Sequence, residues 1–155
     1  MGTQTIRGEA FAALHRRPTI FAIPNPWDAG SGRYLQRLGF KALATTSAGC
    51  AWTNGTADGA AGLDATLANI RAIVSATDLP VNADFESGFA ATPEGVAANV
   101  AACVATGVAG LSIEDSTGHR DHPLHPLPVA VERLRAARAA IDATQTGVLL
   151  VGRAE

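Results

Sequence analysis

The chain has 155 residues, of which 47% are apolar and 17% charged, and this balance excludes an intrinsically disordered protein. Its formal net charge of -2, its isoelectric point near 6.1 and its lack of a basic block give no electrostatic support for binding to nucleic acid or to an anionic membrane. No apolar run approaches the ~20 residues of a membrane span, and the N-terminal segment lacks the apolar core of a signal peptide, so we expect a cytoplasmic protein.

Helix-like and strand-like segments alternate along the chain. Residues 3–17 have apolar side chains spaced by four, which is typical of a helix, and the apolar run 19–25 ends at two prolines and reads as a strand. A helix closed by Gly39 follows, and then a second strand and a loop rich in small and polar residues. In chain order we predict helices at residues 3–17, 27–40, 63–77, 92–107 and 128–144, strands at 19–25, 41–47, 79–84, 109–115 and 148–153, and a loop at 48–63.

The helix expected at 92–107 has sequence signals at both ends. Thr92 is a suitable N-cap, Pro93 fits the first helical position, and Glu94 places a negative charge in the first turn. Gly107 follows the last turn, where glycine commonly ends a helix.

Alternating strands and helices joined by short turns predict a parallel α/β sheet. A doubly wound sheet could close with five strands, whereas a (β/α)8 TIM barrel needs ~250 residues, so this chain would supply strands 1–5 with their helices. No G-x-G-x-x-G follows the first strand, which weakens the dinucleotide-binding alternative. Asp84, Glu114 and Arg153 end successive strands, and this placement of functional groups favours the partial barrel.

The run VNADFE combines an amide and two carboxylates with apolar residues. Side chains alternate along a strand, so Asn82, Asp84 and, if the strand extends that far, Glu86 share one face. Glu114 ends the next strand, and neighbouring strands lie about 4.8 Å apart, so Asp84 and Glu114 could share one ion with Asn82 as a neutral ligand. Such an all-oxygen set suits Mg²⁺. The alternative is that these acids cap helices or are solvated in loops.

Five sequence blocks occur in an order and spacing that is similar to one known family. They are NPWDAGSGRYLQRLGFKALATTSAG, GTADG, VNADFESGFA, GLSIEDSTG and VGRAE, and together they span nearly the whole chain. The chain resembles the isocitrate lyase/phosphoenolpyruvate mutase superfamily, in particular its phosphoenolpyruvate mutase-like branch. The resemblance implies a (β/α)8 barrel that binds Mg²⁺ and a small α-oxo or α-hydroxy carboxylate, and that makes or breaks a C–C or P–C bond through an enolate.

The same resemblance implies roles for individual residues. Asn82 and Asp84 match the metal-binding strand end of the family, where Asn82 replaces an aspartate and removes one negative charge. Glu114 matches a glutamate that reaches the metal through water. Asp58 matches a catalytic aspartate that could steer a proton or a water molecule, and Arg153 matches an arginine that contacts substrate oxygens, a role that suits its planar fork of donors.

The resemblance also implies a substrate-binding segment and departures from known members. Thr46, Ser47 and Ala48 match residues whose hydroxyl and backbone amides hold the substrate carboxylate. The stretch STGHRDHPLHPLP stands where isocitrate lyases carry a cysteine-containing loop and phosphonate mutases a lysine-containing loop, so neither activity is expected in its usual form. What remains is a lyase- or hydrolase-like member.

The stretch STGHRDHPLHPLP contains His119, His122 and His125. The prolines between them prevent a continuous helix and its regular metal spacing, so we expect a lid loop rather than a zinc site. His119 or His122 could still serve as an acid or base in that lid.

The cysteines and tryptophans have structural and functional interpretations. Cys50 and Cys103 are far apart, so neither a disulfide nor a zinc site is expected. Cys103 is expected in the core, and Cys50 is expected to be a packing residue, with a nucleophile as the alternative. Trp27 and Trp52 could line a substrate pocket, although Trp27, at the start of a helix, is expected to pack.

Members of this superfamily are longer than this chain, so we expect residues 1–155 to form a single, C-terminally truncated barrel domain. The strand at 148–153 would then be an open edge, which favours a homo-oligomer or a completing chain as partner. The expected activity is that of a Mg²⁺-dependent lyase or phosphonomutase-like enzyme. The alternatives are an inactive fragment and a small-carboxylate binding module.

Overall fold

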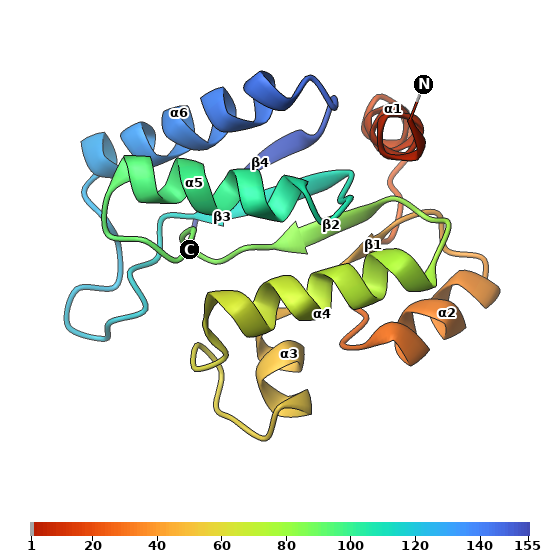
Figure 1. Ribbon diagram of the computed structural model, residues 1–155, viewed down its shortest axis with the longest axis horizontal. Coiled ribbons are helices and arrows are strands. Elements are labelled where there is room, and N and C mark those ends of the chain that lie inside the picture. Colours follow the sequence, from red (N-terminus) through yellow and green to blue (C-terminus); the bar gives the residue numbers. More distant parts are fainter. Residues whose placement is uncertain (1) are drawn as a thin grey trace.

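Four parallel strands form one sheet in the computed structural model, which describes residues 2–155 (Figure 1). The strands lie side by side in chain order, β1-β2-β3-β4, with two helices between β1 and β2 and one helix between each later pair. The strands are β1 (Leu43–Ala44), β2 (Val81–Asp84), β3 (Gly110–Glu114) and β4 (Leu149–Arg153), and the helices are α1 (Thr3–His15), α2 (Ala29–Arg37), α3 (Ser47–Thr53), α4 (Gly62–Ala76), α5 (Pro93–Val104) and α6 (Leu127–Thr144).

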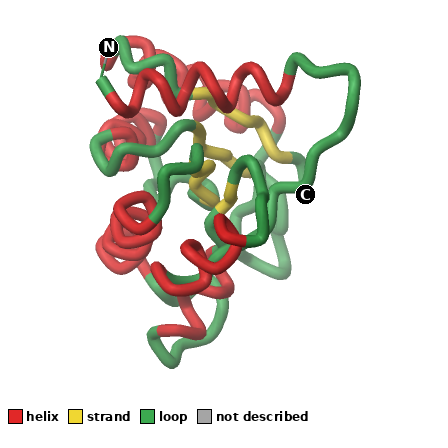
Figure 2. Tube along the Cα trace, turned by 90° about the vertical axis from the view of Figure 1, so that its right-hand side faces the viewer, coloured by secondary structure: helices red, strands yellow, loops and turns green. Residues whose placement is uncertain are grey.

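The two faces of the sheet differ because side chains alternate along each strand. Val81 and Ala83 of β2 are buried in an apolar core against α4, α5 and α6. Asn82 and Asp84 of the same strand point to the other face and line a cavity there. Figure 2 shows the strands at the centre, with helices around part of them. The face that carries Val81 and Ala83, called the outer face, therefore packs against the helices and holds the fold together. The face that carries Asn82 and Asp84, called the inner face, is left for polar groups.

Helix α1 covers the end of the sheet where the strands begin. Phe11 and Leu14 pack there with Ala42 and Ala109, the residues that precede or lie next to the starts of β1 and β3. Gly110 permits this packing, because a Cβ atom at that position would lie 2.7 Å from both Phe11 Cε1 and Asn82 Oδ1. The opposite end of the sheet, where the strands finish, is free of this plug and carries the polar side chains.

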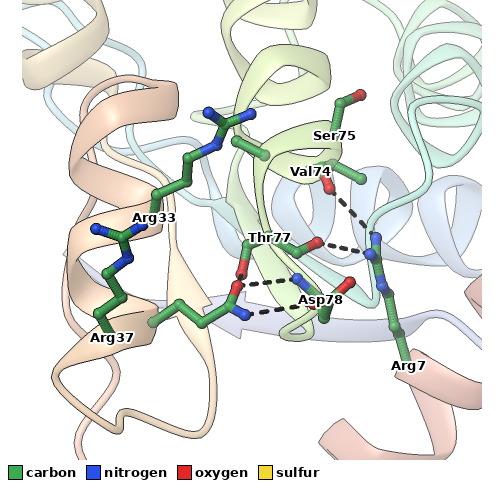
Figure 3. Close-up of a pocket in the computed structure, with 9 residues that line it drawn as sticks. Arg7, Arg33, Arg37, Val74, Ser75, Thr77 and Asp78 are labelled. Atoms are coloured by element: carbon green, nitrogen blue, oxygen red, sulfur yellow. Dashed lines mark hydrogen bonds between the residues drawn. The ribbon is translucent and has the colours of Figure 1, made fainter.

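Arg7 ties α1 to the C-terminal end of α4. Its guanidinium donates to the carbonyl oxygens of Val74, at 3.3 Å, and Thr77, at 2.6 Å (Figure 3). These carbonyls have no partner within the helix, and a cation is favourable at a helix C-terminus. Arg7 therefore has a structural role beside a cavity of about 390 Å³ that Arg33 and Arg37 of α2 also line.

The structure confirms most of the expected elements and corrects two of them. The predicted strand at 19–25 is wrong: the segment is irregular and meets β1 through the bond from Ala44 N–H to Pro24 O, because Pro24 and Pro26 have no N–H to donate. The predicted loop at 48–63 begins within a helix, α3, whose N-cap Thr46 accepts from Gly49 N–H at 3.2 Å. The strand expected at 41–47 is correspondingly short, since β1 has only two residues.

Several local signals are confirmed. Thr92 caps α5 by accepting from Gly95 N–H at 3.2 Å, and Pro93 is its first residue. Gly39 and Gly107 follow α2 and α5 with φ of +90° and +95°, a conformation that favours glycine. Within residues 2–155, none of the helices has both the length and the apolar character that a membrane crossing requires.

Candidate functional site

The strand ends bring three of the expected site residues to one edge of the sheet. Asp84, Glu114 and Arg153 are the last residues of β2, β3 and β4. The parallel register pairs Asp84 with Ser112 and Glu114 with Arg153, so both acids and the arginine lie within one short stretch of the edge. The expectation that these residues meet at the carboxyl ends of the strands is confirmed.

Arg153 joins the two carboxylates. Its Nη1 atom lies 2.8 Å from Glu114 Oε1 and 3.7 Å from Asp84 Oδ1, and its Nε lies 2.5 Å from Glu155 Oε1. The Arg153 side chain is 48% exposed, whereas the side chains of Asp84 and Glu114 are 13% and 12% exposed. One half-exposed cation therefore faces two nearly buried carboxylates, and a third from the chain end.

Asp84 is held by the segment that follows β1. Its Oδ2 accepts from the backbone N–H of Ser47 at 2.9 Å, and its own N–H donates to the Thr45 hydroxyl at 2.9 Å. The other carboxylate oxygen, Oδ1, is buried and has no hydrogen-bond partner. Asn82 Oδ1, two residues earlier on β2, is likewise buried and has no hydrogen-bond partner. Buried oxygens without a partner are costly, so both are poised to accept a ligand.

A cavity of about 440 Å³ opens over these groups. All the residues expected to bind substrate line it, together with the loop aspartate Asp58 and the inner face of β2. Its lining consists of Asn25, Ala44, Thr45, Thr46, Ser47, Ala48, Asp58, Asn82, Asp84, Ser112, Val151 and Arg153. Glu114 is not part of this lining, but its carboxylate forms an ion pair with Arg153, which is.

The expected carboxylate-binding segment is partly used within the chain. The Ser47 N–H is taken by Asp84, and the Thr46 hydroxyl is taken by the first turn of α3. Sequence reasoning missed Thr45 and Ser112, which lie on the strand side of the cavity. Ser112 precedes Glu114 by two residues on β3, so the alternation of the strand could have placed it on the same face.

Negative charge accumulates at the edge of the sheet. The pKa of Glu114 is raised to about 7: burial is the largest cause, the nearby Asp84 and Glu155 carboxylates add to the rise, and Arg153 opposes it. Burial also raises the pKa of Glu86, and the negative charges of Asp84 and Asp58 add to this rise. Carboxylates that resist ionisation because they are buried, and in part because they lie near one another, favour a bound cation. Within residues 2–155, however, no three His, Cys, Asp or Glu side chains are placed to hold a metal, so any cation would rely on Asn82 as well.

The loop after β2 is held in an unusual backbone conformation. Glu86 and Phe89 have φ of +46° and +55°, which side chains other than glycine seldom adopt. Arg133 of α6 fixes this loop, because its buried guanidinium donates to the carbonyls of Ala90 at 2.8 Å and Ala91 at 3.2 Å, and to that of Ser87. Sequence reasoning missed Arg133, since a single arginine in a helix gives no sign of burial.

The remaining chemical candidates lie apart from this cavity. Cys50 and Cys103 are both buried and free, and burial raises the pKa of both thiols, that of Cys103 to about 12. A thiol with a raised pKa is a poor nucleophile, which supports packing roles. His119 and His122 are exposed on a loop closed by the pairing of Ser116 with Leu124. The structure places neither histidine in the lining of the cavity.

A parallel sheet with helices on one face, and with acids and an arginine gathered where its strands end, is the arrangement of part of a (β/α)8 barrel. The model of the phosphoenolpyruvate phosphomutase family matches residues 11–155, and the chain belongs to this family.

Known structures support the fold over the whole chain. A protein of Burkholderia cenocepacia J2315, provisionally described as a lyase/mutase, is 46% identical with a TM-score of 0.96, covering 99% of this chain and 56% of its own. A 2,3-dimethylmalate lyase is 28% identical with a TM-score of 0.85, covering 100% of this chain and 54% of its own. An oxaloacetate acetylhydrolase in complex with its product oxalate is 26% identical with a TM-score of 0.87, covering 96% of this chain and 54% of its own.

The uncharacterized protein Rv1998c of Mycobacterium tuberculosis strain H37Rv is also similar. It is 31% identical over 111 residues, which are 72% of this chain and 42% of that protein. The chain thus spans about half the length of the solved structures and less than half of the mycobacterial relative. The fold is accordingly a partial (β/α)8 barrel.

Proposed function

We propose that this chain carries the catalytic strand ends of a Mg²⁺-dependent lyase-type enzyme that acts on a small α-oxo or α-hydroxy carboxylate and cleaves a C–C or P–C bond through an enolate. The observation that carries this proposal is the pair of buried oxygens without a hydrogen-bond partner, Asn82 Oδ1 and Asp84 Oδ1. They lie on one face of β2 and line the same cavity.

The residues present fit a magnesium ion. Asp84, Glu114 and Asn82 offer only oxygen ligands, which Mg²⁺ prefers, and Mg²⁺ usually keeps several waters, so a set of one amide and two carboxylates is sufficient. Asp84 and Asn82 would contact it directly, and Glu114 through water. A bound Mg²⁺ supplies Lewis-acid stabilisation of negative charge on the α-oxygen of the substrate.

The protein groups around the cavity have separable roles in this proposal. Arg153 binds a substrate oxygen and offsets the charge that develops there. Ser47 N–H fixes the orientation of Asp84, and Thr45 fixes its backbone. Asp58, on the loop that lines the cavity, moves a proton or orients a water at the bond that breaks.

The relatives support the substrate class. The names of the similar solved proteins refer to dimethylmalate and oxaloacetate, and one of them is in complex with oxalate. All three are small carboxylates with oxygen atoms on neighbouring carbons, and oxalate has the shape of the enolate of pyruvate.

The test is a thermal melt of the purified chain with Mg²⁺, with oxalate, and with both. A ligand that binds only the folded state at 100 times its Kd adds about 2.7 kcal/mol of stability, so the melting midpoint should rise when both are present. Asp84→Ala should abolish the rise that depends on Mg²⁺. Glu9→Ala, an exposed acid on α1 at the opposite end of the sheet, is the control and should keep it.

Turnover is then sought with Mg²⁺ and a panel of 2-hydroxy and 2-oxo dicarboxylates and phosphonopyruvate, with products followed by NMR. If Asp84→Ala binds oxalate as the parent does, or if oxalate binding is indifferent to Mg²⁺, the metal assignment is wrong. Binding with no turnover of any compound in the panel would contradict the lyase assignment.

A further inference from the structure

A second cavity, of about 570 Å³, adjoins the acidic one and has an apolar character. The two cavities share three wall residues, Asn25, Thr46 and Ala48. The rest of the second cavity is formed by Trp27, Gly49, Trp52 and Thr53. We name it the tryptophan chamber.

Trp27 has a fixed backbone and an uncovered ring. Its N–H donates to the Ser31 hydroxyl at 3.0 Å, and its carbonyl accepts from Asn69 Nδ2 at 2.8 Å. A Cβ atom on Gly49 would lie 2.8 Å from Trp27 Cβ, so glycine is what lets α3 approach this closely. Trp27 nevertheless stays 51% exposed, so the expectation that it packs is only half met.

Trp52 faces the same space from α3. It follows Ala48 by four residues, so both lie on one side of the helix, while Cys50 and Ala51 on the other side are buried. Trp52 is 70% exposed. Two large aromatic rings left in water around one cavity indicate a surface that gains from a ligand, since aromatic rings dominate apolar binding sites.

We propose that the tryptophan chamber binds an alkyl or aryl substituent of the substrate, whose carboxylate end is held in the cavity over Asp84. This inference rests on the proposed function and names the substrate class more narrowly, as a 2-oxo or 2-hydroxy carboxylate with an apolar side group. The shared wall carries the argument: Thr46 and Ala48 border both cavities, so the cavities adjoin, and we infer that one substrate extends from one into the other. Oxalate, which has no side group, leaves the chamber empty.

The chain offers a direct optical readout. Trp27 and Trp52 are its only tryptophans, so intrinsic fluorescence reports on this chamber alone. The probes are oxalate, pyruvate, 2-oxobutanoate, 2-oxopentanoate, 2-oxohexanoate and phenylpyruvate, each with Mg²⁺, and their Kd values are measured by calorimetry.

We expect Kd to fall about fourfold for each added methylene, the gain for burying a CH₂ group. The longer acids should also shift the tryptophan emission to shorter wavelength, and oxalate should not. Trp52→Ala should remove most of the dependence on chain length, whereas Tyr34→Ala, which removes an exposed aromatic ring on α2 outside the chamber, should retain it. Circular dichroism melts of both variants establish that they are folded.

The outcomes separate this inference from the proposed function. If oxalate binds with Mg²⁺ but Kd is independent of chain length, the chamber does not hold the side group and the proposed function stands. If none of the acids binds, the proposed function is wrong, and the inference that rests on it is wrong as well. If the free chain already shows blue-shifted emission and sediments as an oligomer that Trp52→Ala dissociates, a second copy covers the chamber and the inference is overturned.

Discussion

Replacing Gly49 by alanine should destabilise the chain, although the same change in an ordinary helix interior is stabilising. Gly49 lies in the first turn of α3, and a Cβ atom there would lie 2.6 Å from Thr46 Cγ2 and 2.8 Å from Trp27 Cβ. Carbon atoms pack best at about 3.5–4.0 Å, so each contact is about 1 Å too short. Trp27 Cβ cannot rotate away, because it is attached directly to a backbone that hydrogen bonds hold on both sides.

The magnitude follows from three effects of opposite sign. Overpacking of this kind costs about 1–3 kcal/mol. Rotation of Thr46 to relieve the clash would break its bond to Gly49 N–H and lose a helix cap worth about 1 kcal/mol. Alanine gains up to about 1 kcal/mol over glycine in helix propensity. The net expectation is a loss of about 2 kcal/mol in the free energy of unfolding.

Urea unfolding followed by circular dichroism measures this difference, with Gly30→Ala as the matched control. A Cβ atom on Gly30 of α2 would meet only Asp28 Oδ1, at 3.5 Å, which is an ordinary contact. The control should therefore be neutral or stabilising. If Gly49→Ala unfolds within about 0.5 kcal/mol of the parent chain, the close approach of α3 to Trp27 is not a constraint and the reasoning is refuted.

Substitutions at three further positions test the packing and the charges, each by urea unfolding. Arg133→Met leaves the carbonyls of the loop after β2 without their buried donor and should cost about 2–3 kcal/mol, whereas Arg138→Met, which removes an exposed ion pair, should cost about 0.5 kcal/mol or less. Equal losses would show that the loop does not depend on the guanidinium. Ile73→Ala, at a fully buried core position, should cost about 2–5 kcal/mol, and Ile6→Ala, which is 55% exposed, much less. Asp28→Ala should cost about 1 kcal/mol, because Asp28 caps α2. Bonds from Ser31 hold the pKa of Asp28 below its usual value, so the stability that the ionised cap contributes is complete above the unfolded-state pKa and is lost as pH falls through the lower folded-state pKa. Asp28→Asn should flatten this dependence below pH ~5, and an unchanged profile would contradict it.

The sequence predicted the longer elements because their signals are local. The Thr92–Pro93 start of α5 and the glycine that follows it determine that helix without reference to the rest of the fold. The local signals of segment 19–25 conflict. Its apolar run predicts a strand, but its prolines cannot donate the backbone hydrogen bonds that pair neighbouring strands, and the segment is irregular. Helix α3 was missed because it has only seven residues and contains a glycine in its first turn.

For the candidate site, the sequence could likewise predict which residues meet but not the contacts that they make. Asp84, Glu114 and Arg153 could be placed together because parallel strands end at one edge. The bond from Ser47 N–H to Asp84 and the pairing of Arg153 with Glu155 depend on distances in the folded chain that no spacing in the sequence encodes. The roles of these residues stay predictions until the variants are measured.

The anchoring of the loop after β2 by Arg133 has a consequence for how the site opens. Arg133 bonds to residues 42 to 46 positions earlier in the chain, so α6, which packs beside α5, holds the loop that leads into α5. The loop can therefore release its backbone only when α6 lifts from α5, so local opening should be coupled to a larger unit. In native-state hydrogen exchange, amides at the end of β2 should then exchange with the same free energy and denaturant dependence as amides of α6, rather than with the lower values of an ordinary surface loop.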